Sequence, residues 1–245
     1  MKLGSIPIYV VTAKAFTARH EHMRRIEAKI GVRFEFIFDY DVDELRDSAL
    51  ERVRSDMPKP SISCLLKHFE AQRRFLMTDS EICMVLEDDV ILFDEFERTV
   101  ESVLSKIRDI PPGWLIFLGG ADNKLDTRFL NVEAFDLLES PISTAECYLL
   151  DRRGCLKRNQ WIEKHGFVKP ADHQLAHMDR ELGIKHYRLG RPVATQGSIT
   201  GQFVTTLDSS RRKHSLIFLN LKYRWNRFRR QVLPRLIGEV LGKIK

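Results

Sequence analysis

The sequence predicts an α/β fold built on a mainly parallel, Rossmann-type sheet with helices on both faces. Short β-branched apolar runs alternate with stretches that have helical periodicity, which is typical of strand-helix-strand units. Acidic residues and glycines follow several of the apolar runs, where strands are expected to end. The chain has 245 residues, of which 43% are hydrophobic and 30% charged, so it can bury the core of one large domain.

The first half of the chain predicts three strands and two helices. The first strand is a β-branched run, the second alternates charged and apolar residues, and the third is a short buried run. Thr17 is a candidate cap for the first helix, which Gly31 ends, and Ser61 is a candidate cap for the second helix, which follows a loop marked by Pro58 and Pro60. The expected strands are 6–11, 33–38 and 83–86, and the expected helices are 17–30 and 62–77.

The second half continues the alternation of helices and strands. Pro111, Pro112 and Gly113 predict a turn before a strand that Gly119 and Gly120 end. The expected helices are 93–107, one from about Arg152, and 172–182, and the expected strands are 114–118, 145–150 and 185–189. Ligands of such sheets bind outside the carboxyl ends of the strands. The acids after Phe38, Leu86 and Leu118 are therefore expected at one common edge.

The C-terminal segment differs in charge from the rest of the chain. Residues 211–245 contain 11 basic residues and one acid, whereas residues 1–210 have a net charge of −4. We therefore expect a domain over 1–210 and a basic tail over 211–245. Leu221, Trp225, Phe228 and Val232 recur on one helical face, and Pro234 is expected to interrupt this pattern.

A basic amphipathic helix with Trp and Phe is typical of a segment that lies on an anionic membrane surface. Packing of this helix on the body of the chain, or in a homodimer, stays open, and we expect no nucleic-acid partner. No apolar run approaches the ~20 residues of a membrane span, and the N-terminus lacks the apolar region of a signal peptide. We therefore expect a cytoplasmic protein, peripheral on the inner membrane, with its four cysteines reduced.

The strongest chemical signal is a run of three acids, Glu87, Asp88 and Asp89, directly after a buried strand. Carboxylates at a sheet edge suit a hard cation such as Mn²⁺ or Mg²⁺, which in turn binds phosphates. The run predicts Glu87 and Asp89 as metal ligands. A solvated turn that caps the next helix is the alternative, and a phosphatase or nucleotidyltransferase could use such acids as well.

Four blocks of sequence resemble glycosyltransferase family 25, which includes lipo-oligosaccharide and collagen galactosyltransferases. The first block is the opening strand and the turn that contains Arg19 (8–23), and the second strand with its acidic loop (34–43) belongs to it. The second block is the Cys-containing helix (63–70), and the third is the Glu-Asp-Asp run (86–91). The fourth is a strand-helix block (144–154) followed by the Pro-x-Asp element (170–173). Two departures from the family pattern lie near the expected donor site. Ser63 stands where the family usually has Gly, and Lys67 where it usually has Ser.

The resemblance implies a GT-A-like fold, a nucleotide-sugar donor, a divalent metal and inversion at the anomeric carbon. Inversion needs a general base, for which Asp172 and Asp122 are the candidates; Asp172 could equally be a helix cap. His173 is a weaker candidate for a third metal ligand, and Ser198 and Thr200 lie in a segment expected near the donor. The expected donor-binding residues are Thr12, Arg19, Asp39, Asp41, Lys67, His68, Glu87, Asp88 and Gln196.

The predicted function is therefore metal-dependent transfer of a hexose, with UDP-galactose as the expected donor, to a lipid-linked lipo-oligosaccharide acceptor. Because of Ser63 and Lys67, a catalytically inactive, membrane-associated assembly partner stays open as an alternative. A metal-dependent phosphohydrolase is a third hypothesis, but the nucleophilic Asp motif and paired His-Asp cluster expected of one are absent.

Overall fold

A seven-stranded mixed sheet forms the centre of the protein in the computed structural model, which describes residues 1–121, 123–125, 128, 130, 132–141, 145–205 and 214–240. The strand order is β2 (Glu35–Ile37), β1 (Ile8–Val11), β3 (Ile82–Glu87), β7 (Cys147–Asp151), β5 (Trp114–Phe117), β8 (Lys185–Leu189) and β6 (Leu137–Glu139). A separate two-stranded ribbon pairs β4 (Val90–Leu92) with β9 (Ala194–Gln196).

Most strands of the large sheet run in one direction. β1 pairs in parallel with β2 and β3, and β5 pairs in parallel with β8. β7 is antiparallel to both of its neighbours, β3 and β5, and β6 is antiparallel to β8. The carboxyl ends of β1, β2, β3, β5 and β8 therefore meet at one edge, which confirms the predicted mainly parallel sheet.

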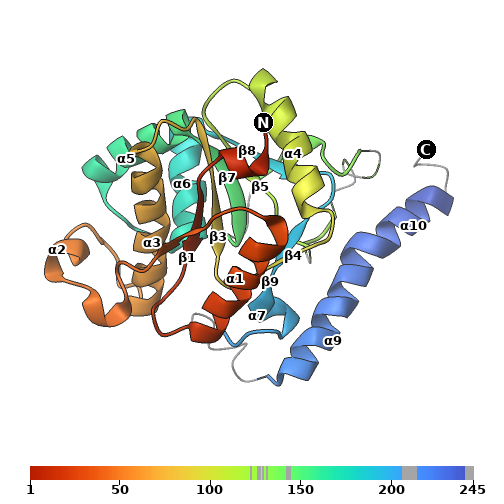
Figure 1. The fold of residues 1–245 in the computed structure, drawn as a ribbon, viewed down its shortest axis with the longest axis horizontal. Coiled ribbons are helices and arrows are strands. Elements are labelled where there is room, and N and C mark those ends of the chain that lie inside the picture. The colour runs from red at the N-terminus through yellow and green to blue at the C-terminus, as the bar shows by residue number, and fades with distance from the viewer. Residues whose placement is uncertain are drawn as a thin grey trace.

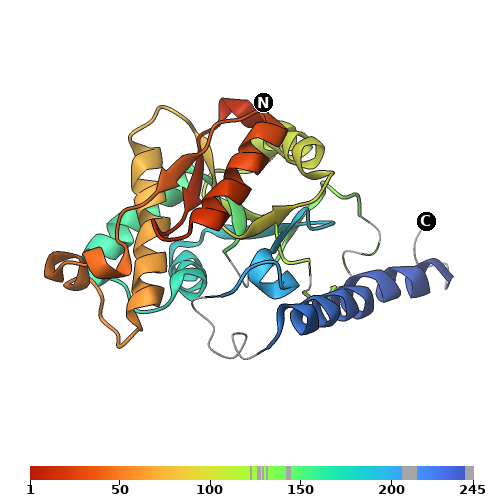
Figure 2. The ribbon, with the colours of Figure 1, turned by 60° about the horizontal axis from the view of Figure 1, so that its bottom comes forward.

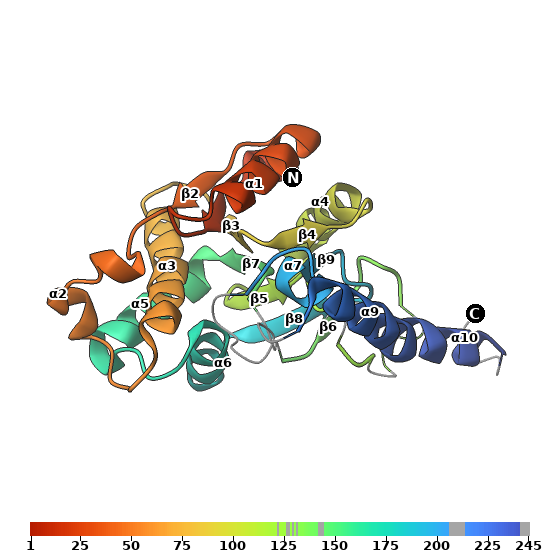
Figure 3. The same cartoon turned by 90° about the horizontal axis from the view of Figure 1, so that it is seen from below.

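Helices cover both faces of the sheet, as predicted (Figure 1, Figure 3). α1 (Thr17–Ile30) and α4 (Phe96–Lys106) lie on one face, and α3 (Lys59–Leu76), α5 (Arg152–His165) and α6 (Ala171–Leu182) lie on the other. Successive side chains of a strand point to opposite faces. Met84 and Leu86 of β3 accordingly pack under α1 and α4, whereas Cys83 and Val85 join the core beneath α3, α5 and α6.

Several element boundaries differ from the sequence prediction. α1 spans the predicted residues and ends at Gly31, whose φ of 66° suits glycine, but its N-cap is Phe16 rather than Thr17. α3 begins at Lys59, before the predicted cap Ser61, because Pro58 is the N-cap and Pro60 lies in the first turn, where proline needs no backbone donor. The predicted helix 93–107 starts only at Phe96, because the strand β4 precedes it.

Five short elements were not predicted from the sequence, since each has too few residues to show a period. They are the strands β4, β6 and β9 and the short helices α2 (Asp47–Leu50) and α7 (Gly197–Thr200). Within the described residues, the chain also forms helical turns at Leu3–Ser5, Val42–Glu44 and Ile107–Asp109.

The C-terminal segment forms helix α9 (Leu216–Arg227), a π-helical turn (Phe228–Val232) and helix α10 (Leu233–Val240), which together make one rod beside the body (Figure 2). The rod packs on the body through Leu219 and Tyr223, which are buried. Asn220 Nδ2 also donates a hydrogen bond of 3.0 Å to the carbonyl oxygen of Thr200 in α7. The predicted apolar face points away from this contact, and Leu221 and Trp225 are each 60% exposed.

The helical rod continues through Pro234, although the α-helix gives way to a π-helical turn just before it. A proline in a helix removes the hydrogen bond to the carbonyl four residues earlier and crowds that carbonyl. Here the preceding turn widens to a π-helix, and the carbonyl oxygen of Arg230 accepts a hydrogen bond of 3.0 Å from the backbone N–H of Leu125. The body of the protein therefore satisfies the group that proline leaves unpaired.

Candidate active site

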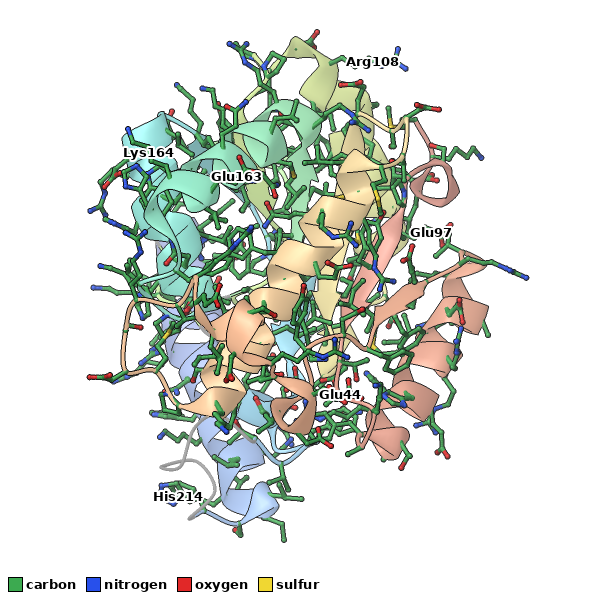
Figure 4. All side chains as sticks on the ribbon, turned by 90° about the vertical axis from the view of Figure 1, so that its left-hand side faces the viewer. Glu44, Glu97, Arg108, Glu163, Lys164 and His214 are labelled. Carbon is green, nitrogen blue, oxygen red and sulfur yellow. The ribbon has the colours of Figure 1, made fainter. Side chains whose placement is uncertain are left out.

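A pocket of about 450 Å³ opens at the carboxyl ends of β1, β2 and β3. Figure 4 places Glu44, in the segment after β2, at the same end of the molecule as His214 and opposite Arg108. Because this pocket opens at the carboxyl ends of the strands, it lies at the edge of the sheet where the sequence predicts a ligand. The predicted residues that line it are Thr12, Arg19, Asp41, Lys67, Glu87, Asp88, Asp89, Gln196 and Ser198.

Asp88 links the first and third strands at the floor of the pocket. Its Oδ2 accepts a hydrogen bond of 2.6 Å from Thr12 Oγ1, and its Oδ1 pairs with Arg19 Nη1 at 2.6 Å. Burial raises the pKa of the Asp88 carboxyl above its usual range, although Arg19 and Thr12 partly oppose this. Arg19 also donates to the carbonyl oxygen of Val204, so its guanidinium is fixed at the pocket wall rather than free on the surface of α1.

Glu87 lies between Gln196 and His68. Gln196 Nε2 donates a hydrogen bond of 2.9 Å to Glu87 Oε2, and His68 Nε2 lies 3.5 Å from Glu87 Oε1. Burial alone would raise the pKa of Glu87, but the neighbouring His68 and Gln196 outweigh it and hold this pKa below its usual value. Glu87 therefore stays ionised at neutral pH.

Asp89 is the most strongly perturbed of the three acids. Burial, together with the negative charges of Glu87 and Asp88, raises its pKa to about 7, although Arg19 and the N–H of Ser198 oppose the shift. The Ser198 N–H donates to Asp89 Oδ2 at 2.9 Å. Asp89 thus sits where a further positive charge would be stabilising.

The donor set fits a divalent cation of the Mn²⁺ or Mg²⁺ type. Three consecutive carboxylates line the pocket, and Arg19 pairs with one of them, Asp88. Both oxygens of Asp88 are engaged by protein groups, whereas Glu87 accepts a hydrogen bond from Gln196 through Oε2 and Asp89 accepts one from Ser198 through Oδ2. Hard cations prefer such oxygen ligands. Glu87 and Asp89 are accordingly the residues that would hold the ion.

The loop after β2 is fixed by the two residues that depart from the family pattern. Ser63 Oγ donates a hydrogen bond of 2.6 Å to the carbonyl oxygen of Tyr40, which has the unusual φ of 63°. Lys67 Nζ donates to the carbonyl oxygen of Asp39 at 2.5 Å and pairs with Asp41 Oδ1 at 2.7 Å. The two substitutions therefore stabilise one turn, which places Asp41 in the pocket wall.

The other predicted site residues that the structure describes do not line the pocket. The Asp39 side chain pairs with Arg74, away from the pocket. Asp172 is half-buried in the first turn of α6, where it accepts a hydrogen bond from the N–H of His173, and Pro170 rather than Asp172 is the N-cap. His173 is exposed. Asp122 lies outside the described residues.

His68 and Cys64 lie behind the acids on α3. His68 is fully buried and its Nδ1 lies 2.9 Å from Tyr148 Oη. Cys64 lines the pocket, and burial together with the nearby acids, Glu87 first among them, raises the pKa of its thiol. Cys64 was not among the predicted site residues, although its position one turn before His68 on the same helix face could have identified it.

The part of the chain that the structure describes contains no helix that is both long and apolar enough to cross a membrane.

Comparison with known proteins identifies the family. The profile of glycosyltransferase family 25, described as an LPS biosynthesis protein family, matches residues 5–136. A protein of Aedes aegypti described as "Glycosyltransferase 25 family member" is 27% identical over 132 residues, which cover 48% of this chain and 22% of that protein. The matched region thus spans about a fifth of the length of this relative.

Two solved structures are similar to this chain at 10% identity. One is the galactosyltransferase LgtC in complex with donor and acceptor sugar analogues, with a TM-score of 0.48 over 89% of this chain and 96% of that chain. The other is a glycosyltransferase involved in glycosylation of the major capsid of PBCV-1, with a TM-score of 0.43 over 85% of this chain and 99% of that chain. The family match covers more than half of the sequence, and it includes the Glu87–Asp89 acids and the Arg19 strand-helix unit. The chain belongs to glycosyltransferase family 25.

Proposed function

We propose that this protein is a metal-dependent, inverting hexosyltransferase that takes a sugar from a nucleotide-sugar, with UDP-galactose as the first candidate. The observation that carries the proposal is the cluster of Glu87, Asp88 and Asp89 with Arg19 in one pocket at the carboxyl edge of the sheet. Family membership supplies the reaction class. The acceptor is a saccharide, and a lipid-linked lipo-oligosaccharide is the substrate we expect.

The pocket residues have separable tasks in this reaction. A divalent ion held by Glu87 and Asp89 would neutralise the charge that develops on the departing nucleoside diphosphate. Gln196 and the N–H of Ser198 orient these two carboxylates. The guanidinium of Arg19 can bind phosphate oxygens with two of its N–H groups, which a lysine could not do with the same geometry. Lys67 and Asp41 shape the wall after β2, where the nucleoside is expected.

An inverting reaction also needs a base for the acceptor hydroxyl. Asp172 is the proposed base; it is half-buried in the first turn of α6, outside the residues that line the pocket, and its negative charge is one of several that raise the pKa of the Cys64 thiol in that lining. Asp122 remains its rival. Replacing each by Asn and comparing kcat separates the two, since loss of the base lowers kcat about 10²–10⁴-fold.

The proposal is tested by the apparent stability of the purified protein with UDP-, GDP- and CMP-sugars, with and without Mn²⁺. A ligand that binds only the folded state raises the melting temperature. We expect a UDP-hexose to do so only with the metal, followed by sugar transfer to a saccharide acceptor. The alternative function is that of a catalytically inactive, membrane-associated assembly partner. It is supported by Lys67, whose buried ion pair with Asp41 lies in the wall of the expected nucleoside site. Lack of any response to all three donors would favour that alternative.

We also propose that the tail holds the enzyme at an anionic membrane surface. The exposed face of the rod carries Leu221, Trp225, Phe228 and Val232, and five basic residues lie within 222–230. The rod begins beside α7, the segment whose Ser198 contacts Asp89. A membrane that binds this face would therefore lie near the pocket that receives a lipid-linked acceptor.

Leu221→Asp is expected to weaken binding to vesicles that contain anionic lipid by about tenfold or more, because burying one leucine contributes ~1.5–3 kcal/mol. Sedimentation with vesicles at low and high salt measures this. Met77→Asp is the matched control, because Met77 is 67% exposed on the body of the protein. Equal loss of binding in both variants, or in neither, would contradict a membrane role for the tail face.

A further inference from the structure

Three potential metal ligands of mixed chemistry meet at the back of the pocket. The thiol of Cys64, the imidazole of His68 and the carboxylate of Glu87 each offer one ligand atom, and these atoms all lie within 4.8 Å of one another. Cys64 and His68 are four residues apart on α3 and so share one helix face. Glu87 approaches from the end of β3.

The His68 side chain points into this group with one nitrogen unpaired. His68 is fully buried, and its Nδ1 contacts Tyr148 Oη at 2.9 Å. Its buried Nε2 faces Glu87 Oε1 at 3.5 Å but makes no hydrogen bond of good geometry with it or with any other described residue. A buried polar atom without a hydrogen bond is unfavourable, so a bound ion would stabilise this nitrogen. When Nδ1–H donates to the tyrosine, Nε2 carries the lone pair that a metal ion binds, and such a second partner is typical of metal-binding histidines.

One measured spacing, between the nitrogen and the oxygen, already suits a tetrahedral ion, and all three ligand atoms lie within 4.8 Å of one another. Zinc binds nitrogen and oxygen at about 2.0–2.2 Å and sulfur at about 2.3 Å, so ligand atoms around it lie about 3.3–3.7 Å apart. The distance from His68 Nε2 to Glu87 Oε1 is already 3.5 Å. Cys64 lines the pocket, which gives an ion a route of entry and leaves its fourth position facing the pocket.

We propose that Cys64, His68 and Glu87 form a binding site for a thiophilic divalent cation of the Zn²⁺ type. A thiolate and an imidazole favour zinc over Mg²⁺ or Mn²⁺, which prefer oxygen ligands. On binding, the Cys64 thiol releases its proton to solvent. This site differs from the expected Mn²⁺ or Mg²⁺ site in its sulfur and nitrogen ligands, and it shares Glu87 with it.

Because both metal sites use the Glu87 carboxylate, zinc binding should inhibit sugar transfer, an expectation that rests on the proposed transferase function. Zinc bound to Glu87 withdraws that carboxylate from the hard metal, so micromolar zinc inhibits sugar transfer and excess Mn²⁺ restores it. Cys64→Ser lowers this sensitivity to zinc. The binding site itself, however, can be tested without any sugar.

Titration of the metal-stripped full-length protein with Co²⁺ tests the site directly. We expect one ion per chain and a sulfur-to-cobalt charge-transfer band, which Zn²⁺ removes. Cys64→Ser removes the band and weakens zinc binding by more than the roughly 10–100-fold that loss of an outer partner causes. His173→Asn, which changes an exposed histidine on the neighbouring helix α6, leaves the band unchanged and is the matched control.

Absence of the band in the wild-type protein, or its persistence in Cys64→Ser, would overturn the proposal. Glu87→Gln is the second variant, because it keeps the thiol and nearly the same shape and should retain the band with weaker affinity. Thermal unfolding of each variant checks that it is folded. A protein that transfers sugar but gives no band refutes the zinc site alone, and one that gives the band but responds to no donor refutes the transferase alone.

Discussion

Asp89→Asn is expected to lower kcat for sugar transfer by at least about 10²–10³-fold, the range seen when one preorganised electrostatic group is removed from a transition state. The change keeps the size of the side chain and its acceptor oxygen for the Ser198 N–H. It removes the charge that a divalent ion needs. Initial rates with saturating UDP-hexose, across a series of Mn²⁺ concentrations, measure the effect. Near-normal turnover would exclude Asp89 as a metal ligand.

Asp39→Asn is the matched control for this experiment. Asp39 also follows β2 at the carboxyl edge of the sheet, but its side chain pairs with Arg74 outside the pocket. We expect its effect on kcat to be within about threefold, because an exposed ion pair contributes about 0–1 kcal/mol. Equal losses in both variants would indicate a general effect of charge at this edge rather than metal binding.

The stability of Asp89→Asn distinguishes a lost ligand from a damaged fold. Burial raises the pKa of Asp89 to about 7 in the folded protein, whereas the pKa of an aspartate in the unfolded chain is about 4. Between about pH 4 and pH 7 the folded protein therefore keeps a proton on Asp89 that the unfolded chain has released. Metal-free wild-type protein should therefore lose stability as the pH rises through this window. Asn has no charge to desolvate, so Asp89→Asn should be as stable as the wild type at pH 5 and more stable at pH 8 in the presence of a chelator.

The sequence predicted the sheet edge but not the full order of strands. Runs such as 83–86 and 147–150 are apolar throughout because both faces of their strands are buried, and an apolar run of this kind does not reveal the direction in which its strand runs. The antiparallel course of β7 between β3 and β5 therefore could not be predicted from its residues. The strands β4 and β9 have three residues each, too few to show a pattern in the sequence, and they are recognised only from their pairing in the structure.

In the candidate site, likewise, the sequence could identify some of the acidic residues but could not tell which others face the pocket. Glu87, Asp88 and Asp89 were predictable because charges at the end of a buried strand need a partner. Asp39 and Asp41 looked equivalent in sequence, yet the turn at Tyr40, with its φ of 63°, directs Asp41 to Lys67 and the pocket and Asp39 to Arg74. A local backbone reversal of this kind is set by tertiary hydrogen bonds, here from Ser63 and Lys67.

The largest expected effect on stability comes from a buried ion pair beneath the sheet. Arg158 of α5 and Asp179 of α6 are both fully buried and form two hydrogen bonds, Nε to Oδ1 and Nη2 to Oδ2, each of 2.7 Å. His186 Nε2 lies 2.6 Å from the same carboxylate. Burial would raise the pKa of Asp179, but Arg158 and His186 outweigh it and lower this pKa. The pair therefore joins α5, α6 and β8 through one charged centre.

Asp179→Asn should lower the free energy of unfolding by about 3–5 kcal/mol, because it leaves the guanidinium of Arg158 buried without its countercharge. Urea unfolding at pH 7 measures this loss, and Asp172→Asn on the same helix, where the side chain is half-buried, is the control. Since the folded-state pKa of Asp179 lies below its unfolded value, its contribution is present at neutral pH and is lost as the pH falls through the folded pKa. The difference in free energy of unfolding between the wild type and Asp179→Asn should therefore become smaller at acidic pH.

The double replacement Arg158→Met with Asp179→Leu should recover most of the lost stability, because apolar side chains of similar size need no countercharge. A double variant as unstable as Asp179→Asn would instead mean that the hydrogen bonds of this centre, including that of His186, fix the packing of α5 and α6 in a way apolar contacts cannot replace.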